Sequence, residues 1–198
     1  MASMEQAHGS NQLSDKEKTA IGEAMKEAES LILAKNKNAK ATSNQDEQVV
    51  FVTGFMKNIC SKDMYITKTS IFDGEREFMD PPAKRILGYR AGMFVHMSLP
   101  LSHSKGAIIY DHAPNGSDPD LGWLLAWDKS NDFNKVYVEA GTLDRINKIP
   151  DNVITQKLAV SGNISRFWDS ETGASVAAEI KKWDSSMSLL VVTFDQVM

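Results

Sequence analysis

The stretch Gly122-Trp123-Leu124-Leu125-Ala126-Trp127, with the polar loop 129–134 and the run Lys135-Val136-Tyr137 after it, decides the fold. Trp123, Leu125 and Trp127 stand at every second position, which puts their side chains on one face of a β-strand. Ser, Asn and Asp dominate the loop, as is usual for a turn between strands. The stretch therefore predicts two neighbouring strands joined by a short loop.

The same period of two extends over most of the chain from Val49 onward. Short runs rich in Val, Ile, Thr and aromatic residues alternate with Gly, Pro, Asn and Asp, so that the turn residues fall between the runs. Residues 173–180 fit a strand better than a helix. Without an intervening helical pattern, many short strands predict a mainly β protein, an antiparallel β-sandwich. We expect its other strands at 49–55, 64–72, 91–99, 105–111, 122–128, 135–140, 157–161 and 188–194.

An amphipathic helix is expected before the strands. Ser14-Asp15-Lys16-Glu17 has the spacing of a capping box, and an apolar stripe with steps of three and four residues follows it. The helix should cover about 15–35, and the small and polar residues 36–46 should form a linker. We therefore expect an N-terminal arm at 1–46 and a single β-sandwich domain at 47–198. The stripe consists of Ile21, Met25, Ala28, Leu31 and Ile32.

Composition and charge exclude several classes of protein. Of the 198 residues, 42% are hydrophobic and 24% charged, which is typical of a globular domain and not of a disordered chain. The net charge of −4 supplies no basic field, so nucleic acid is not an expected partner. The single cysteine, Cys60, favours a reducing compartment, and the first residues contain no signal peptide. We expect a cytoplasmic protein.

Catalytic signatures are absent from the sequence. It contains no glycine-rich nucleotide loop, no His-Glu-x-x-His and no Gly-x-Ser-x-Gly. We therefore predict no catalytic residue, no metal and no cofactor. An alternative stays open: an enzyme of plant specialised metabolism with an acid/base site. Its site would use Asp111 or Asp128 with a nearby histidine, in an aromatic pocket lined by Trp123 and Trp127.

Phe133 is the most suggestive aromatic residue outside the strands. It lies in the polar loop, where full burial of its ring is less expected than in a strand. An aromatic ring among hydrogen-bonding side chains is suited to a sugar ring or a lipid head group. The loop is therefore a candidate binding site.

Four blocks of sequence resemble the plant 23 kDa jasmonate-induced protein family. The likeness spans about 49–183 and implies a stress-responsive plant protein. The blocks are Gly92-Met93-Phe94-Val95-His96, Lys105-Gly106-Ala107-Ile108-Ile109-Tyr110, Gly122-Trp123-Leu124-Leu125-Ala126-Trp127 and Asn134-Lys135-Val136-Tyr137.

A more distant resemblance is to actinoporins and the fungal nakanori lipid-binding group. Asn58-Ile59-Cys60-Ser61-Lys62-Asp63-Met64-Tyr65, residues 106–110 and the pair Phe133-Asn134 carry it. It implies an actinoporin-like β-sandwich in which the loop after 122–127 recognises a lipid head group. Actinoporins also insert an N-terminal amphipathic helix into the membrane. Here Phe133, Asn134 and Tyr137 match their loop, whereas its clustered tryptophans are absent.

These patterns predict a non-enzymatic, stress- or defence-related binding protein for a lipid head group or a carbohydrate. Peripheral contact with a membrane fits this prediction. Insertion fits it less well, because lysines and acidic residues are equally numerous in 1–40. A helix that packs on a partner chain is a further alternative, and the sequence predicts no oligomeric state. The candidate ligand-binding residues are Trp127, Ser130, Asp132, Phe133, Asn134 and Tyr137.

Overall fold

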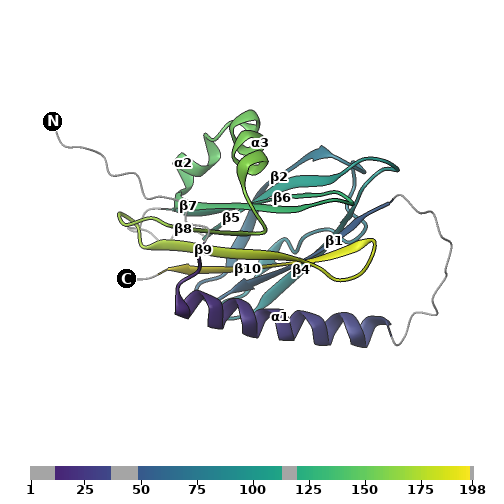
Figure 1. Ribbon diagram of the computed structural model, residues 1–198. Helices are drawn as coiled ribbons and strands as arrows, with labels where there is room; N and C mark the ends of the chain where they lie inside the picture. The colour runs from purple at the N-terminus through teal and green to yellow at the C-terminus, as the bar shows by residue number, and fades with distance from the viewer. Residues whose placement is uncertain (1–11, 37–48, 113–119, 197–198) are drawn as a thin grey trace.

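The computed structural model describes residues 12–36, 49–112 and 120–196. Two β-sheets lie face to face, with one long helix below them and two short helices above them in the view of Figure 1. The predicted β-sandwich is therefore confirmed. The predicted linker lies, from residue 37 onward, outside the described residues.

The first sheet has the strand order β4-β1-β10-β9-β8. Neighbouring strands in this sheet are antiparallel, except that β1 and β10 run parallel, with Phe51 opposite Met187. The sandwich is thus not purely antiparallel. Its strands are β1 (Phe51–Asn58), β4 (Ala91–Met97), β8 (Ile164–Trp168), β9 (Ala174–Lys182) and β10 (Met187–Gln196).

The second sheet has the order β3-β2-β5-β6-β7, and all its neighbours are antiparallel. Residues 122–137 form most of β6 and the start of β7, and the two strands pair as predicted, with Lys129 opposite Asn134 at the turn. Its strands are β2 (Met64–Asp73), β3 (Arg85–Ile86), β5 (Ser104–His112), β6 (Leu121–Lys129) and β7 (Asn134–Thr142).

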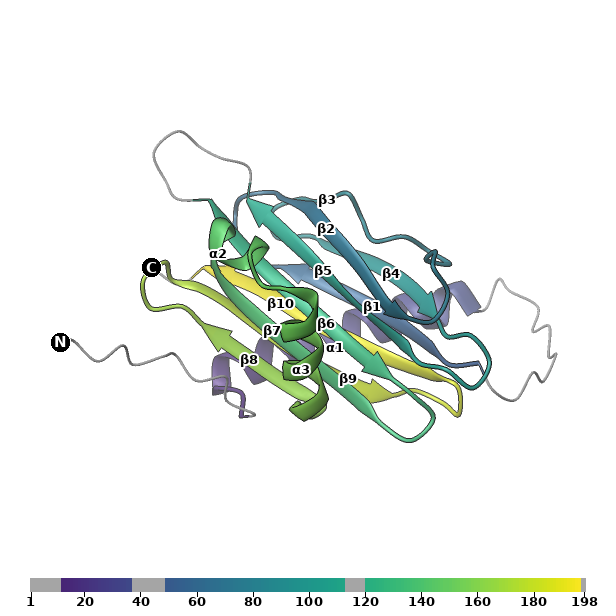
Figure 2. The same cartoon turned by 90° about the horizontal axis from the view of Figure 1, so that it is seen from above.

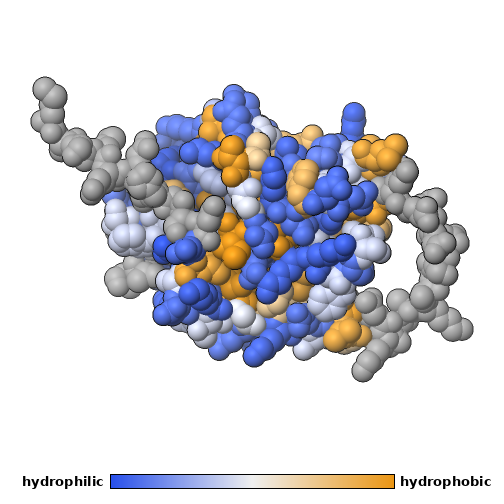
Figure 3. Space-filling model, in the orientation of Figure 1, coloured by the Kyte–Doolittle hydropathy of each residue, from blue (hydrophilic) through white to orange (hydrophobic). Residues whose placement is uncertain are grey.

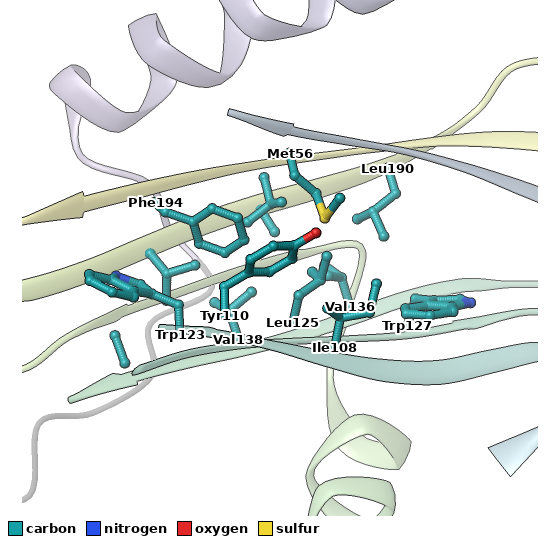
Figure 4. Close-up of a cluster of buried hydrophobic side chains, with 14 of the residues drawn as sticks. Met56, Ile108, Tyr110, Trp123, Leu125, Trp127, Val136, Val138, Leu190 and Phe194 are labelled. Atoms are coloured by element: carbon teal, nitrogen blue, oxygen red, sulfur yellow. The ribbon is translucent and has the colours of Figure 1, made fainter. Parts of the chain in front are cut away.

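The main core fills the space between the sheets, as Figure 4 shows. Trp123, Leu125 and Trp127 project into it from β6, and Val176 and Ile180 from β9, because alternate residues of a strand share a face. Burial of these large side chains supplies most of the driving force for folding. The indole N–H of Trp123 donates to the Ser175 carbonyl at 3.0 Å, so its burial leaves no unpaired polar group.

Helix α1 (Asp15–Asn36) packs on the outer face of the first sheet (Figure 1). Its capping box is formed as predicted: the Ser14 amide donates to Glu17 at 2.7 Å, and the Glu17 amide donates to Ser14 Oγ at 3.3 Å. The predicted stripe is buried except Leu31, which is 43% exposed. The Lys57–Glu27 ion pair, at 2.8 Å, ties the helix to β1.

None of the helices within the described ranges is long and apolar enough to cross a membrane. The amphipathic stripe of α1 faces the sandwich instead.

Two helices were missed by the sequence patterns. The strand predicted at 157–161 is wrong, because these residues finish helix α3 (Asp151–Val160), which follows the short helix α2 (Leu143–Asn147). Ile154 and Leu158 lie four residues apart and pack together on the outer face of the second sheet, which is helical spacing. Residues 157–161 are too few to show the helical period, which becomes visible only when Ile154 is included. Residues 173–180, favoured as a strand, form most of β9.

Candidate functional site

A hollow of about 490 Å³ lies at one end of the sandwich, beside the turn between β6 and β7. In Figure 2 the β6–β7 and β9–β10 hairpins end side by side at this edge of the molecule. Cationic and amide side chains predominate in the lining, with one aromatic ring and one carboxylate. The lining residues are Lys129, Asn131, Asp132, Phe133, Asn134, Asn163, Ile180, Lys181 and Lys182.

Ser130 gives the β6–β7 turn its shape. Its hydroxyl accepts hydrogen bonds from the Asp132 amide at 3.1 Å and the Phe133 amide at 3.2 Å. Its own amide donates to the Phe133 carbonyl at 3.1 Å. A short polar side chain that satisfies nearby amides is a common way to fix a turn. Ser130 therefore orders the loop, and it is not among the residues that line the hollow.

Phe133 is held half-buried at the edge of the hollow. The His103 ring meets it edge to face at 5.2 Å between centroids, and Lys135 Nζ lies 4.9 Å from its centroid. His103 is fixed in turn, because its Nδ1 lies 2.8 Å from a carboxylate oxygen of buried Asp128, which also pairs with Lys105 at 3.1 Å. Phe133 is thus positioned by a ring contact with a histidine that polar contacts hold in place.

Lys129 is a residue of this end that sequence reasoning missed. It is only 2% exposed, although a lysine is almost never fully buried without a partner. Its ammonium group donates to the Ser130 carbonyl. Burial, and after it the charge of Lys182, lowers the pKa of Lys129. Its position signals this burial, because residue 129 has the same parity as Trp123, Leu125 and Trp127.

The structure does not bring two of the predicted site residues to the hollow. Trp127 is fully buried in the main core, where its indole N–H donates to Ser104 Oγ at 3.1 Å. Tyr137 lies on the outer face of the second sheet, packed with the cluster formed by α2 and α3. Its hydroxyl donates to Glu139, and burial raises the pKa of Tyr137. Of the six predicted residues, Asp132, Phe133 and Asn134 line the hollow, and Ser130 shapes its turn.

The geometry also bears on the alternative of an enzyme. Trp123 and Trp127 are fully buried and pack in the core, so neither lines an open pocket. Asp111 stands on β5, and burial raises the pKa of its carboxyl group. Asp128 does meet a histidine, His103, but the pair supports Phe133 and binds Lys105. Within the described ranges, no three side chains of His, Cys, Asp or Glu gather as a metal site would require.

A second hollow, of about 570 Å³, separates α1 from strands β8 and β9. Apolar side chains of the helix and of β8 form its floor, and two lysines lie at its rim. Figure 3 shows apolar surface in this area, framed by polar residues. Its lining includes Leu13, Lys18, Ile21, Met25, Ile164 and Lys181.

A two-sheet β-sandwich with helices on both outer faces has a counterpart among solved structures. The crystal structure of the lipid binding protein Nakanori superimposes with a TM-score of 0.62 at 15% sequence identity, over 88% of this chain and 79% of that one. The fold is therefore that of Nakanori. A lectin of Xerocomus chrysenteron matches with a TM-score of 0.48 and 10% identity, over 74% of this chain and 99% of the lectin.

Sequence comparison adds a plant relative. A jasmonate-induced protein homolog from Atriplex canescens is 29% identical over 111 residues, which are 54% of this chain and 60% of the relative. The chain thus spans about three-fifths of the relative that it matches. The resemblance to jasmonate-induced proteins is confirmed in sequence, and the resemblance to the nakanori group is confirmed in fold. No protein-family model matches the chain.

Proposed function

We propose that this protein is a non-enzymatic binding protein with a stress- or defence-related role, and that its ligand is a lipid head group or a carbohydrate. The observation that carries the proposal is the hollow beside the β6–β7 turn, which combines an aromatic ring with amide and charged groups. Small-molecule sites are concave, have volumes in this range, and use placed polar groups beside aromatic surface to orient the ligand. The likeness to a jasmonate-induced protein homolog supports the stress-related role.

Phe133 would supply the apolar surface of the site, against which the C–H face of a sugar ring or the polyol of a head group packs. Asn131 and Asn163, both exposed, would offer amide groups to hydroxyls at the rim. The Ser130 turn and the His103 contact hold Phe133 in place before the ligand arrives. Such preorganisation lowers the entropic cost of binding.

The neighbouring β4–β5 loop supports peripheral contact with a membrane. It exposes Leu99 and, at 79%, Leu101, while His103 of the same loop contacts Phe133. Exposed apolar side chains beside a head-group site would lie at the boundary between head groups and acyl chains. Nakanori, which has the same fold, is itself described as a lipid binding protein, and this agrees with a lipid ligand.

The proposal is tested by binding of the full chain to vesicles of defined lipid composition and to a glycan array. Phe133→Ala should weaken whichever interaction the wild type shows by about tenfold or more, the equivalent of about 1.4 kcal/mol. Trp168→Ala is the matched control, because Trp168 is 48% exposed, ends β8 and does not line the hollow. It should bind like the wild type.

Two results would contradict the proposal. One is a wild-type protein that binds neither vesicles nor glycans of any composition. The other is a Phe133→Ala variant that binds as tightly as the wild type while remaining folded.

A further inference from the structure

The inner faces of two strands end in lysine at the same end of the sandwich. On β6 the core-facing positions are Trp123, Leu125 and Trp127, and the next in the series is Lys129. On β9 the inward residues Val176, Ala178 and Ile180 are followed in the same way by Lys182. Both lysines line the hollow. Both inward-facing series therefore finish in a lysine at this end, of which Lys129 is buried and Lys182 is exposed.

The burial of Lys129 is unusual in its lack of an acidic partner. A buried ammonium group loses its hydration and normally gains a carboxylate in return. Over the part of the chain that the structure describes, no ion pair joins Lys129 to Asp or Glu. The lysine donates to the Ser130 carbonyl, which uses one of the three N–H donors of an ammonium group.

Three lysines and one carboxylate, Asp132, line the hollow, so its lining carries an excess of positive charge. Lys182 repels it, and repulsion between like charges grows where water is excluded. Asp132 and Asp184 attract it from nearby. The carboxylate of Asp184 also accepts hydrogen bonds from the amides of Ser186 at 2.9 Å and Met187 at 2.7 Å, and Asp184 does not line the hollow. An anion between the two lysines would relieve their repulsion.

We propose that the hollow recognises the phosphate of a phosphorylated polyol, with Lys129 and Lys182 as the groups that hold the phosphate. A phosphate monoester carries close to two negative charges at neutral pH, which matches two lysines better than a single carboxylate would. The polyol then lies toward Phe133, Asn131 and Asn163 at the rim. This inference rests on the proposed function and names the ligand class of the same site.

The phosphorylated polyol has two possible sources, which the experiment separates. The soluble probes are inositol monophosphate and unphosphorylated inositol, with binding followed by calorimetry. The membrane probes are vesicles of phosphatidylcholine, with and without a tenth of phosphatidylinositol monophosphate. Binding of the soluble phosphate indicates a free sugar phosphate or a head group, whereas binding to the doped vesicles alone indicates a membrane lipid. Either pattern supports the proposal.

Lys129→Met and Lys182→Met test the two lysines in the full chain. Methionine keeps an unbranched side chain of similar length and removes the charge. Both variants should weaken binding of the phosphorylated probe at least tenfold. Lys182 is exposed at the strand end, so its replacement leaves the core intact even if Lys129→Met folds poorly. Lys157→Met on α3 is the matched control, an exposed lysine away from the hollow that should bind like the wild type.

The failure of this inference can be told apart from the failure of the proposed function. If inositol binds as tightly as its phosphate and the lysine variants bind normally, while Phe133→Ala loses binding, the phosphate site is overturned and the binding function stands. If neither phosphorylated nor unphosphorylated probes bind to the wild type, the phosphate site is overturned. The proposed function is overturned with it only if the other vesicles and the glycan array also show no binding.

Discussion

At one end of the sandwich the inner faces of β6 and β9 finish in Lys129 and Lys182, whereas at the other end they begin with Leu121 and Ala174. Both ends have the same two sheets and the same alternation. They differ in how the interior is closed: small and apolar side chains seal one end, and cationic and amide groups border a hollow at the other. A fold that needs only a closed core does not require the second arrangement.

His112 at the apolar end and Lys129 at the hollow are both buried ionisable groups, but their surroundings differ. At the apolar end His112 packs on Trp123, 4.5 Å between ring centroids, and its Nε2 has no hydrogen-bond partner in the described structure. Burial lowers the pKa of His112 to about 4, so its ring is neutral at neutral pH. At the hollow, Lys129 keeps hydrogen-bonding capacity toward an open space. This contrast agrees with the proposed binding role of the second end.

The largest expected effect is a difference in stability between alanine variants of Trp127 and Phe133, two aromatic residues that the sequence patterns assigned to one binding site. Trp127→Ala should reduce the free energy of unfolding by about 4 kcal/mol, because it leaves a cavity in the core next to Phe94. Phe133→Ala, in a half-buried loop position, should cost less than about 1 kcal/mol. Urea unfolding at neutral pH measures both values.

A larger loss of stability in Phe133→Ala than in Trp127→Ala would contradict this comparison. A Trp127→Ala protein that unfolds at the same urea concentration as the wild type would show that Trp127 is not a core residue.

The next effect concerns pH and the apolar end. The unfolded chain takes up a proton on the His112 imidazole near pH 6.5, whereas the folded chain does so only near pH 4. Acid therefore favours unfolding within this interval. The free energy of unfolding should fall as the pH is lowered from 6.5 to 4, with a contribution from His112 of up to about 3 kcal/mol.

His112→Leu isolates this contribution, since all other titrating groups remain. The variant should lose stability less steeply than the wild type over the same pH interval. Identical pH dependence in the two proteins would contradict the burial of a neutral His112.

Sequence patterns predicted most of the fold because alternation is a local signal. The opening stretch gave β6 and β7, and the Ser14–Glu17 capping box gave the start of α1. Strand β8 and helix α3 were missed because each is too short to show a clear local period. Helix α3 buries only Ile154 and Leu158. The parallel pairing of β1 with β10 joins segments from opposite ends of the chain, which no local pattern reveals.

The site was predicted only in part. Phe133 stood out because an aromatic ring in a polar loop is conspicuous, and it does line the hollow. Lys129 and Lys182 did not stand out in the sequence, because a lysine at the end of a strand is usually solvated. Their parity with the core residues before them was the available signal. Asn163 joins the site only through tertiary structure: its carbonyl accepts from the Ile180 amide at 2.9 Å.

The most direct test of the account is an NMR titration of the isotope-labelled full chain with inositol monophosphate. The amide signals of Lys129, Phe133, Asn163 and Lys182, which border the hollow, should shift with ligand concentration. The signals around His112 and Trp168, away from the hollow, should stay in place. Shifts confined to the latter group would contradict the assignment of the hollow as the binding end of the sandwich. An absence of shifts would contradict it too if the vesicles with phosphatidylinositol monophosphate also fail to bind.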